Sequence, residues 1–313
     1  MAQQNQDILR QTRKETISLP KNQKIRFLVS EDHGSFSPSH YHEAIEVICV
    51  LEGSCIVTMP DRTITLESGQ FLVINSGLVH ASRCPSTGNH TILLQIPDEF
   101  LSAYLPDPSK LWFSIDYNST SEMVQNQIQR LRELLLSMGK MKKEAQPGYM
   151  LSVMKLLFEF LEILYRNFLH EMPGDYHPKS ARVLSRLDAV LTFTQENYNR
   201  AISLGEAASV AALQPEYFCR FFRQNMGMTY NAYLNDYRLS RVYRDLIATD
   251  QGVGELSAKH GLTNEKLFHR LFRERFHMTP LQVRKMARLA ENNIYYRTED
   301  EKNDERRIGT GGN

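Results

Sequence analysis

The sequence lacks any long uncharged apolar run. No segment approaches the roughly 18 apolar residues that a membrane-spanning helix requires. The first residues, from Met1 to Gln6, are polar and lack the apolar core of a signal peptide. We therefore expect a cytoplasmic protein without a membrane partner.

Cysteine and tryptophan are also scarce. The four cysteines are scattered, without a Cys-x-x-Cys pair: Cys49, Cys55, Cys84 and Cys219. Such spacing excludes a disulfide-stapled scaffold and a cysteine-rich zinc module, and it fits reduced thiols. The single tryptophan, Trp112, is expected either in the core or over a ligand. No further pattern is typical of a catalytic site, so the sequence predicts a protein that is not an enzyme.

The net charge of the whole chain is close to zero, but charged residues are unevenly distributed along it. The whole chain carries +1, whereas residues 181–290 hold 16 lysines and arginines against 10 aspartates and glutamates. The remainder is therefore slightly acidic. A basic segment beside an acidic one is the electrostatic pattern expected of a protein that binds the phosphates of a nucleic acid.

This basic segment contains one pattern written twice. The pairs Phe218 and Phe268, Arg220 and Arg270, Phe222 and Phe272, Arg223 and Arg273, and Thr229 and Thr279 are each 50 positions apart. Upstream, Gly205 and Gly254 are 49 apart, so the second copy has one extra residue in the turn near Asn264. A repeat at a fixed offset indicates two copies of one structural unit.

Each copy has the pattern of a helix-turn-helix unit. In the first, the small residues Ala207, Ala208 and Ala211 lie on one helical face, and Pro215 suits the first turn of the next helix. In the second, Gly261 forms the turn and Asn264 is the expected N-cap. We expect the phenylalanines of both second helices to be buried and their basic residues to be exposed. Helix 230–249 would join the two units.

The repeat resembles the tandem DNA-binding domain of the AraC/XylS family of transcription regulators. The run from Phe268 to Arg273 followed by Met278, Thr279, Pro280 and Arg284 is close to the family signature. His277 and Ala212 depart from it, because the family commonly has glycine at both places. The resemblance implies that two recognition helices enter successive major-groove segments of promoter DNA. It assigns DNA contact to Glu216, Tyr217, Cys219, Arg220, Arg223, Asn264, Lys266, Leu267, Arg270 and Arg273.

The amino-terminal part reads as short β-strands separated by turns. Gly53 and the Pro60–Asp61 pair are the expected hairpin turns. Many short strands at regular spacing favour a barrel or jelly roll. The expected strands are 25–29, 44–51, 54–59, 63–66, 70–74, 80–84 and 91–96.

Two histidine-containing motifs lie on these strands. Gly34, His40, His42, Glu46 and Gly53 follow the spacing G-x5-H-x-H-x3-E-x6-G, and Gly69, Asn75, Gly77 and His80 follow G-x5-N-x-G-x2-H. Both resemble the signature motifs of the cupin superfamily, although Asn75 and Cys84 replace the usual Pro and Asn.

Strand parity would place residues 40, 42 and 46 on one side of a single strand, facing His80. Three imidazoles and a carboxylate could hold a divalent transition metal. They could instead contact an effector, or brace the barrel without binding anything. We therefore treat His40, His42, Glu46 and His80 as candidates for effector binding and for metal binding, with no other cofactor expected.

Two amphipathic helices are expected after the barrel, over 122–138 and 149–170. The second has a broad apolar surface that the barrel, the other helix or a second subunit must cover. The resemblance to AraC-type regulators implies a homodimer interface there, whereas packing within the chain is the alternative. The candidate interface residues are Met154, Leu157, Phe158, Leu161, Leu164 and Tyr165.

Together these patterns predict an α+β protein of several domains. A cupin-like β-barrel or jelly roll is followed by helices and then by an all-α tandem helix-turn-helix domain. The expected parts are an arm (1–20), a barrel (21–115), a helical segment (116–171), a linker (172–180), a DNA-binding domain (181–290) and a disordered tail (291–313).

The expected function is transcription regulation by sequence-specific binding to double-stranded promoter DNA, controlled by a small-molecule effector such as a carbohydrate. RNA polymerase is a further partner if the protein is an activator. The alternatives are a metal-dependent cupin enzyme with a DNA-binding appendage and a regulator that needs no effector.

Overall fold

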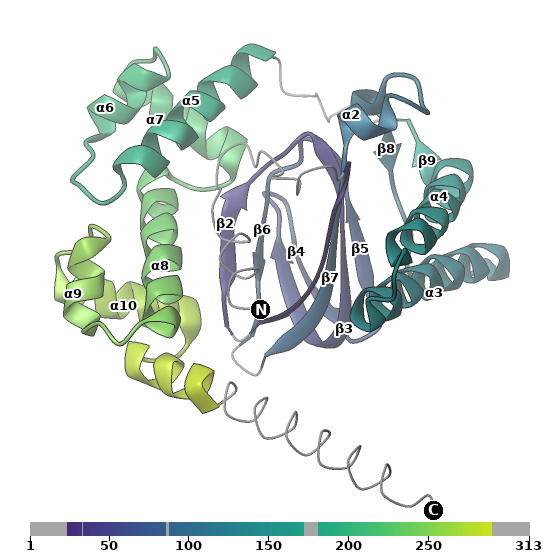
Figure 1. The fold of residues 1–313 in the computed structure, drawn as a ribbon. Coiled ribbons are helices and arrows are strands. Elements are labelled where there is room, and N and C mark those ends of the chain that lie inside the picture. Colours follow the sequence, from purple (N-terminus) through teal and green to yellow (C-terminus); the bar gives the residue numbers. More distant parts are fainter. Residues whose placement is uncertain (1–23, 33, 86–87, 172–180, 290–313) are drawn as a thin grey trace, which may run out of the picture.

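The computed structural model describes residues 24–32, 34–85, 88–171 and 181–289. The arm, linker and tail expected at 1–20, 172–180 and 291–313 lie outside these ranges. The strands form a bent, barrel-like sheet with helices on two sides (Figure 1). Its strands are β1 Arg26–Asp32, β2 Phe36–His40, β3 Ala44–Thr58, β4 Thr63–Glu67, β5 Phe71–Ile74, β6 His80–Arg83 and β7 Asn89–Pro97.

Strand β3 organises the barrel. Its first half pairs antiparallel with β5 and β7, and its second half pairs with β4 and β6. The predicted hairpin turn at Gly53 is wrong, because Gly53 lies within β3, where its positive φ of 76° accompanies a shift in pairing with β7. Glycine tolerates this conformation, so the strand can bend without ending. The turn at Pro60 is correct, since β4 follows it.

The helices of the middle segment cover one face of the sheet. Helix α3 Glu122–Glu144 and helix α4 Tyr149–Phe168 share one apolar core with strands β1 and β7. Short elements complete this side: α2 Asp98–Leu101, the 3-10 helix Pro108–Lys110, β8 Trp112–Phe113 and β9 Leu169–His170. Trp112 is half-buried in β8. No helix in the described ranges is both long and apolar enough to cross a membrane.

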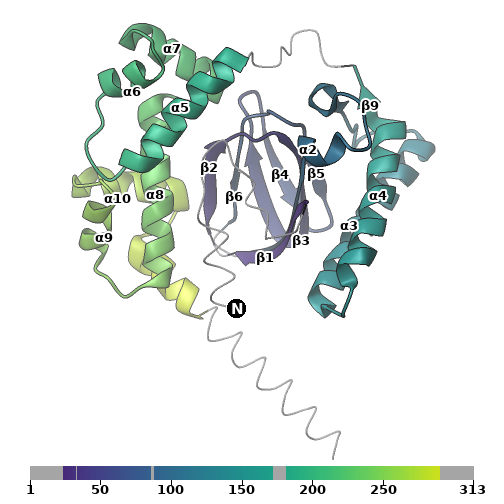
Figure 2. The same ribbon diagram turned by 45° about the horizontal axis from the view of Figure 1, so that its top comes forward.

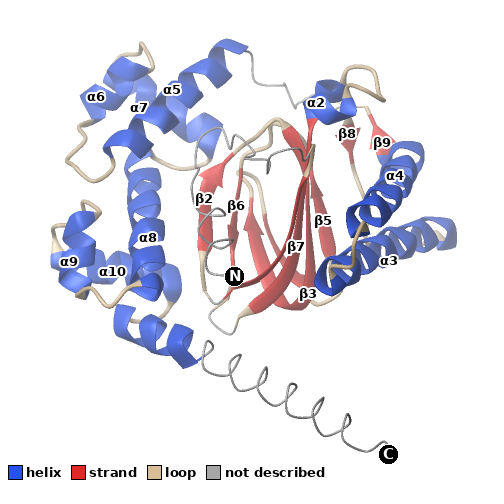
Figure 3. Ribbon diagram, viewed as in Figure 1, coloured by secondary structure: helices blue, strands red, loops and turns tan. Residues whose placement is uncertain are grey.

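The carboxy-terminal helices lie beside β2, on the other side of the barrel (Figures 2 and 3). They are α5 Ala181–Asn197, α6 Leu204–Val210, α7 Pro215–Met226, α8 Tyr230–Ala248, α9 Val253–Lys259 and α10 Glu265–Phe276. Helix α5 was not predicted from the motifs, because it precedes the repeat and has no counterpart in it. Helices α6 and α7 lie at one end of α8, and α9 and α10 lie at the other (Figure 1).

The two helix-turn-helix units have separate cores. The first core gathers residues of α5, α6, α7 and the start of α8, and the second gathers residues of α8, α9 and α10. The phenylalanines Phe218, Phe222, Phe268 and Phe272 are at most 1% exposed, as predicted. Asn264 caps α10 by accepting a hydrogen bond from the Leu267 N–H at 3.0 Å, which confirms the predicted N-cap.

Two left-handed positions recur in both units, with the glycine in opposite places. In the turn, Gly261 of the second unit (φ 78°) is equivalent to Ala212 of the first (φ 51°). After the recognition helix, Gly227 of the first unit (φ 72°) is equivalent to His277 of the second (φ 56°). His277 thus adopts a left-handed conformation where the family commonly has glycine, and this conformation costs a non-glycine residue about 1–2 kcal/mol.

We expect Gly261→Ala to lower the free energy of unfolding by about 2–4 kcal/mol. The new Cβ would add left-handed strain and would lie 2.7 Å from the Tyr198 carbonyl oxygen. The matched variant Ala212→Gly removes such strain in the first unit and should change stability by about 1 kcal/mol at most, towards stabilisation. Urea denaturation followed by circular dichroism measures both, and equal stabilities would contradict the geometric assignment.

Candidate functional site

The recognition helix of the first unit, α7, presents a polar face to solvent. Proline stands at its first turn, and Gly227 ends it in a left-handed conformation. The guanidinium carbon of Arg220 lies 6.0 Å from the centre of the Tyr217 ring. All the expected contact residues of this helix are exposed: Glu216, Tyr217, Cys219, Arg220 and Arg223.

Helix α10 presents the equivalent face in the second unit. Lys266, Arg270 and Arg273 are exposed, and Arg270 lies 3.8 Å from Glu274 in a loose ion pair. Asn264 is exposed, but its side-chain oxygen caps the helix, and Leu267 is half-buried. The sequence-based set omitted His269, an exposed residue that is equivalent to Cys219. The repeat offset could have identified it.

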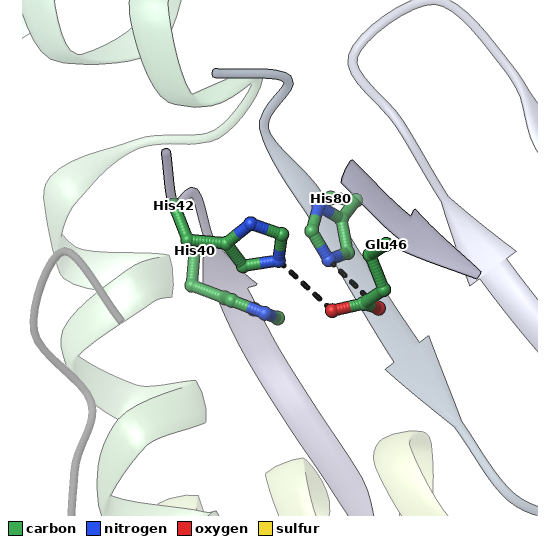
Figure 4. Close-up of side chains that lie close together, drawn as sticks. All are labelled: His40, His42, Glu46 and His80. Atoms are coloured by element: carbon green, nitrogen blue, oxygen red, sulfur yellow. Dashed lines mark hydrogen bonds and ion pairs between the residues drawn. The ribbon is translucent and has the colours of Figure 1, made fainter. Parts of the chain in front are cut away.

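The second candidate site lies at one end of the barrel. His40, His42, Glu46 and His80 are all buried, and one ligand atom from each falls within 4.8 Å of the others. Figure 4 shows the imidazoles of His42 and His80 directed towards the Glu46 carboxylate. The assumption that 40, 42 and 46 share one strand is wrong, because β2 ends at His40 and β3 begins at Ala44. Their side chains nevertheless converge.

Backbone carbonyls orient all three imidazoles. The Nδ1 atoms of His40, His42 and His80 lie 2.9, 3.2 and 3.0 Å from the carbonyl oxygens of Pro38, Ala44 and Leu78 respectively. A carbonyl oxygen only accepts, so each Nδ1 carries the hydrogen and each neutral ring keeps a lone pair on Nε2. Backbone partners that fix the tautomer in this way are typical of metal-ligating histidines.

The carboxylate of Glu46 is surrounded by these rings. His42 Nε2 lies 2.9 Å from one of its oxygens, and His80 Nε2 lies 3.3 Å from the other. Burial acts to raise the pKa of Glu46, but imidazoles that carry a second proton, on Nε2, hold that pKa well below its ordinary value through the charge of His80 and through their hydrogen bonds. Lone pairs facing a carboxylate at these distances need a proton or a cation between them. The cluster therefore fits a small divalent cation.

Gln95 belongs to the same cluster, although no motif in the sequence predicted it. Its side-chain nitrogen donates to Glu46 Oε2 at 2.7 Å, and its oxygen accepts from Arg26 at 3.1 Å. The signal was present in the sequence, since Gln95 interrupts the apolar run of β7. In the structure its side chain is only 1% exposed.

The candidate dimer residues on α4 divide into two groups. Leu157, Leu161 and Leu164 are at most 8% exposed and belong to the core shared with α3 and the sheet. Met154 and Tyr165 are half-buried, and Phe158 is 39% exposed. The three buried leucines are thus engaged within the chain, and only the others can contact a partner directly.

Comparisons with known proteins match both halves of this chain. A helix-turn-helix domain model matches residues 207–286, and a cupin domain model matches residues 27–96. The uncharacterized HTH-type transcriptional regulator YdeC of Bacillus subtilis is 22% identical over 293 residues, covering 90% of this chain and 97% of its own. The HTH-type transcriptional activator RhaS of Escherichia fergusonii is 24% identical over 257 residues, covering 80% and 88%.

Among solved structures, ToxT of Vibrio cholerae aligns over 84% of this chain and 99% of its own with a TM-score of 0.46 and 10% identity. The two domain matches follow the order of the barrel and the tandem units described above, and relatives named as transcription regulators align across both. The chain is therefore a helix-turn-helix transcription regulator with a cupin-like amino-terminal domain, and it is similar to regulators of the AraC/XylS type.

Proposed function

We propose that α7 and α10 read two successive major-groove segments of a promoter, and that occupancy of the cupin-like domain controls this binding. The observation that carries the proposal is the pair of exposed arginines repeated on each recognition helix, Arg220 with Arg223 and Arg270 with Arg273. Arginine can donate two hydrogen bonds to one guanine, and a major groove admits an α-helix. Two units joined by one helix, α8, would contact the same face of the duplex.

Selection of bound fragments from random double-stranded DNA tests this reading and yields the operator. We expect a bipartite motif whose two halves are separated by about one helical turn, as for other paired helix-turn-helix readers. Recovery of fragments without a shared motif, at a salt concentration that suppresses non-specific binding, would contradict sequence-specific reading by this pair.

The polar end of the barrel is the proposed binding site for a small ligand. Its interior is packed with apolar side chains of β3, β4 and β5, among them Val50, Val57 and Leu66. The polar groups gather around Glu46. A carbohydrate effector would have to bind at this polar end, and a thermal-shift screen with sugars tests it, because a ligand selective for the folded state raises the melting temperature.

A divalent transition metal is the second candidate occupant, favoured by the three oriented imidazoles. His40, His42, His80 and Glu46 would hold it, and Gln95 would orient the carboxylate. Imidazole nitrogen suits iron, copper, nickel and zinc. Such an ion would supply positive charge that neutralises the buried carboxylate.

We expect the purified full chain to bind close to one equivalent of Zn²⁺ or Co²⁺ after dialysis, and the His42→Ala variant to lose it. Free ion at about 100 times its dissociation constant should stabilise the protein by about 2.7 kcal/mol. Elemental analysis and thermal unfolding measure the two effects. His90→Ala is a matched control, because this half-buried histidine of β7 lies outside the cluster. Equal metal content in all three proteins would contradict the assignment.

The remaining partners are proposals as well. The relative from Escherichia fergusonii is named an activator, and an activator of this type would contact RNA polymerase at the promoter. A homodimer through Met154, Phe158 and Tyr165 of α4 is proposed from their partial exposure. Turnover of a small substrate by the metal-loaded chain would instead favour the enzyme alternative.

A further inference from the structure

Residues directly adjacent to the histidines of the cluster touch the DNA-binding domain. Tyr41 lies between His40 and His42, and Val79 immediately precedes His80. Tyr41 and Val79 are 1% and 2% exposed, and both belong to the hydrophobic core of the first helix-turn-helix unit. The barrel therefore contributes two side chains to the core beneath a recognition helix.

The contacts of Tyr41 are specific. Its hydroxyl donates to the Leu184 carbonyl of α5 at 3.2 Å. In the same core, α5 packs with Phe218 and Phe222 of α7. Tyr41 is thus connected to the recognition helix through one continuous set of packed side chains.

A second contact joins the end of α7 to the barrel. A Cβ built on Gly227 would lie 3.2 Å from the Cα of Pro60, in the hairpin between β3 and β4. This contact comes from a part of the barrel that has no histidine ligand. Within the described residues the first unit therefore touches the barrel at these two places among others, and the Tyr41 and Val79 contact adjoins the cluster.

The histidines and their neighbours cannot move independently. Consecutive residues of an extended chain point to opposite sides. His40 and His80 are direct partners across β2 and β6, with ring centres 4.3 Å apart. A change in the backbone that draws these imidazoles together must also change the positions of Tyr41 and Val79 on the opposite side.

We propose that occupancy of the cluster by a divalent cation is thermodynamically linked to docking of the first helix-turn-helix unit, through Tyr41 and Val79. This inference rests on the proposal that the cluster holds such an ion. The second unit touches the barrel elsewhere, through Phe36, which packs edge-to-face against Phe276 with ring centres 5.5 Å apart. The ion would therefore act on the half of the DNA reader that contains α7.

Linkage of this kind is reciprocal. If the ion strengthens docking, then weakening the docking contact must weaken ion binding by the same factor, typically about five-fold or more. The test uses the full chain with Co²⁺ as the probe. Visible absorption reports ligation of the ion, and amide hydrogen exchange of segment 184–194 of α5 reports docking.

In the wild-type chain we expect Co²⁺ to slow exchange in this segment about five-fold or more. Tyr41→Leu and Val79→Ala should keep the absorption band at saturating Co²⁺ and lose the exchange response. Their dissociation constants for Co²⁺ should rise by a similar factor. Tyr41→Phe, which keeps the ring, provides a milder variant should Tyr41→Leu fail to fold. Phe36→Leu, on β2 but against the second unit, is the matched control and should respond like the wild type.

Two results distinguish failure of this inference from failure of the metal proposal. An absorption band without any change in α5 exchange overturns the linkage and leaves metal binding intact. If no band forms, the metal proposal is wrong. The linkage between the cluster and docking is then tested by amide exchange of α5 in the Glu46→Gln variant, because this change removes the carboxylate charge among the three imidazoles. Unchanged α5 exchange in Glu46→Gln would then overturn the linkage too.

Discussion

Replacing Arg220 or Arg270 by alanine is expected to weaken binding to the selected operator by about 1–3 kcal/mol each. The two side chains are exposed at equivalent positions of α7 and α10, and their neighbours among the described residues, Tyr217 and Glu274, are exposed as well. Because they lie on different units far apart along α8, their effects should add, giving about 2–6 kcal/mol in the double variant. Electrophoretic or fluorescence titration against operator and scrambled duplexes measures the loss.

The control for charge alone is Arg166→Ala. Arg166 is an exposed arginine on α4, paired with Glu162 at 2.9 Å and remote from both recognition helices. It should leave operator affinity unchanged. If Arg220→Ala and Arg270→Ala weaken operator and scrambled DNA equally, then they contact phosphate rather than bases. If neither variant changes operator affinity, the placement of the recognition surface is wrong.

Replacing Phe272 by alanine is expected to lower the free energy of unfolding of the second unit by about 3–5 kcal/mol. The side chain is fully buried, and its ring centre lies 4.3 Å from that of Phe276 and 5.6 Å from that of Phe268. Whole domains are stable by only about 5–15 kcal/mol, so most of the stability of this unit would be lost.

Phe222→Ala makes the equivalent change in the first unit, where Phe222 packs against Tyr230 and Tyr233. Hydrogen exchange resolved along the chain should show the loss in α9 and α10 for one variant and in α6 and α7 for the other. Leu281→Ala, at a 66% exposed position beside the second unit, should change stability by no more than about 0.5 kcal/mol. Uniform loss of protection in both units would contradict the separation of the two cores.

The carboxy-terminal half was largely predictable from sequence. The repeat defined both helix-turn-helix units, since the periodic phenylalanines fixed the buried faces and Pro215 and Asn264 marked the helix starts. Such local signals act within a few residues. Helix α5 was not predicted because it has no counterpart in the repeat. Its packing against α6 and Tyr41 depends on residues far apart in the chain.

The barrel was predictable as a class but not in its details. Motif spacing selected the correct four residues of the cluster, yet it placed a turn at Gly53 where the strand continues. Whether a glycine ends a strand or bends it is decided by pairing partners such as Asn89, which lies 36 residues away. Gln95 and Tyr41 were missed for the same reason, because their importance arises from contacts across the fold rather than from a local pattern.

At each of the two left-handed positions, one unit has glycine and the other has a different residue. This difference has a consequence for protein engineering. At each of these positions, one unit has the glycine that would remove backbone strain from the other unit. Gly261 shows which residue position 212 tolerates, and Gly227 shows which residue position 277 tolerates. The two helix-turn-helix units of this one chain can therefore be compared position by position, as two aligned homologous sequences are. Consensus design, which ordinarily needs many homologues, could begin here from one protein.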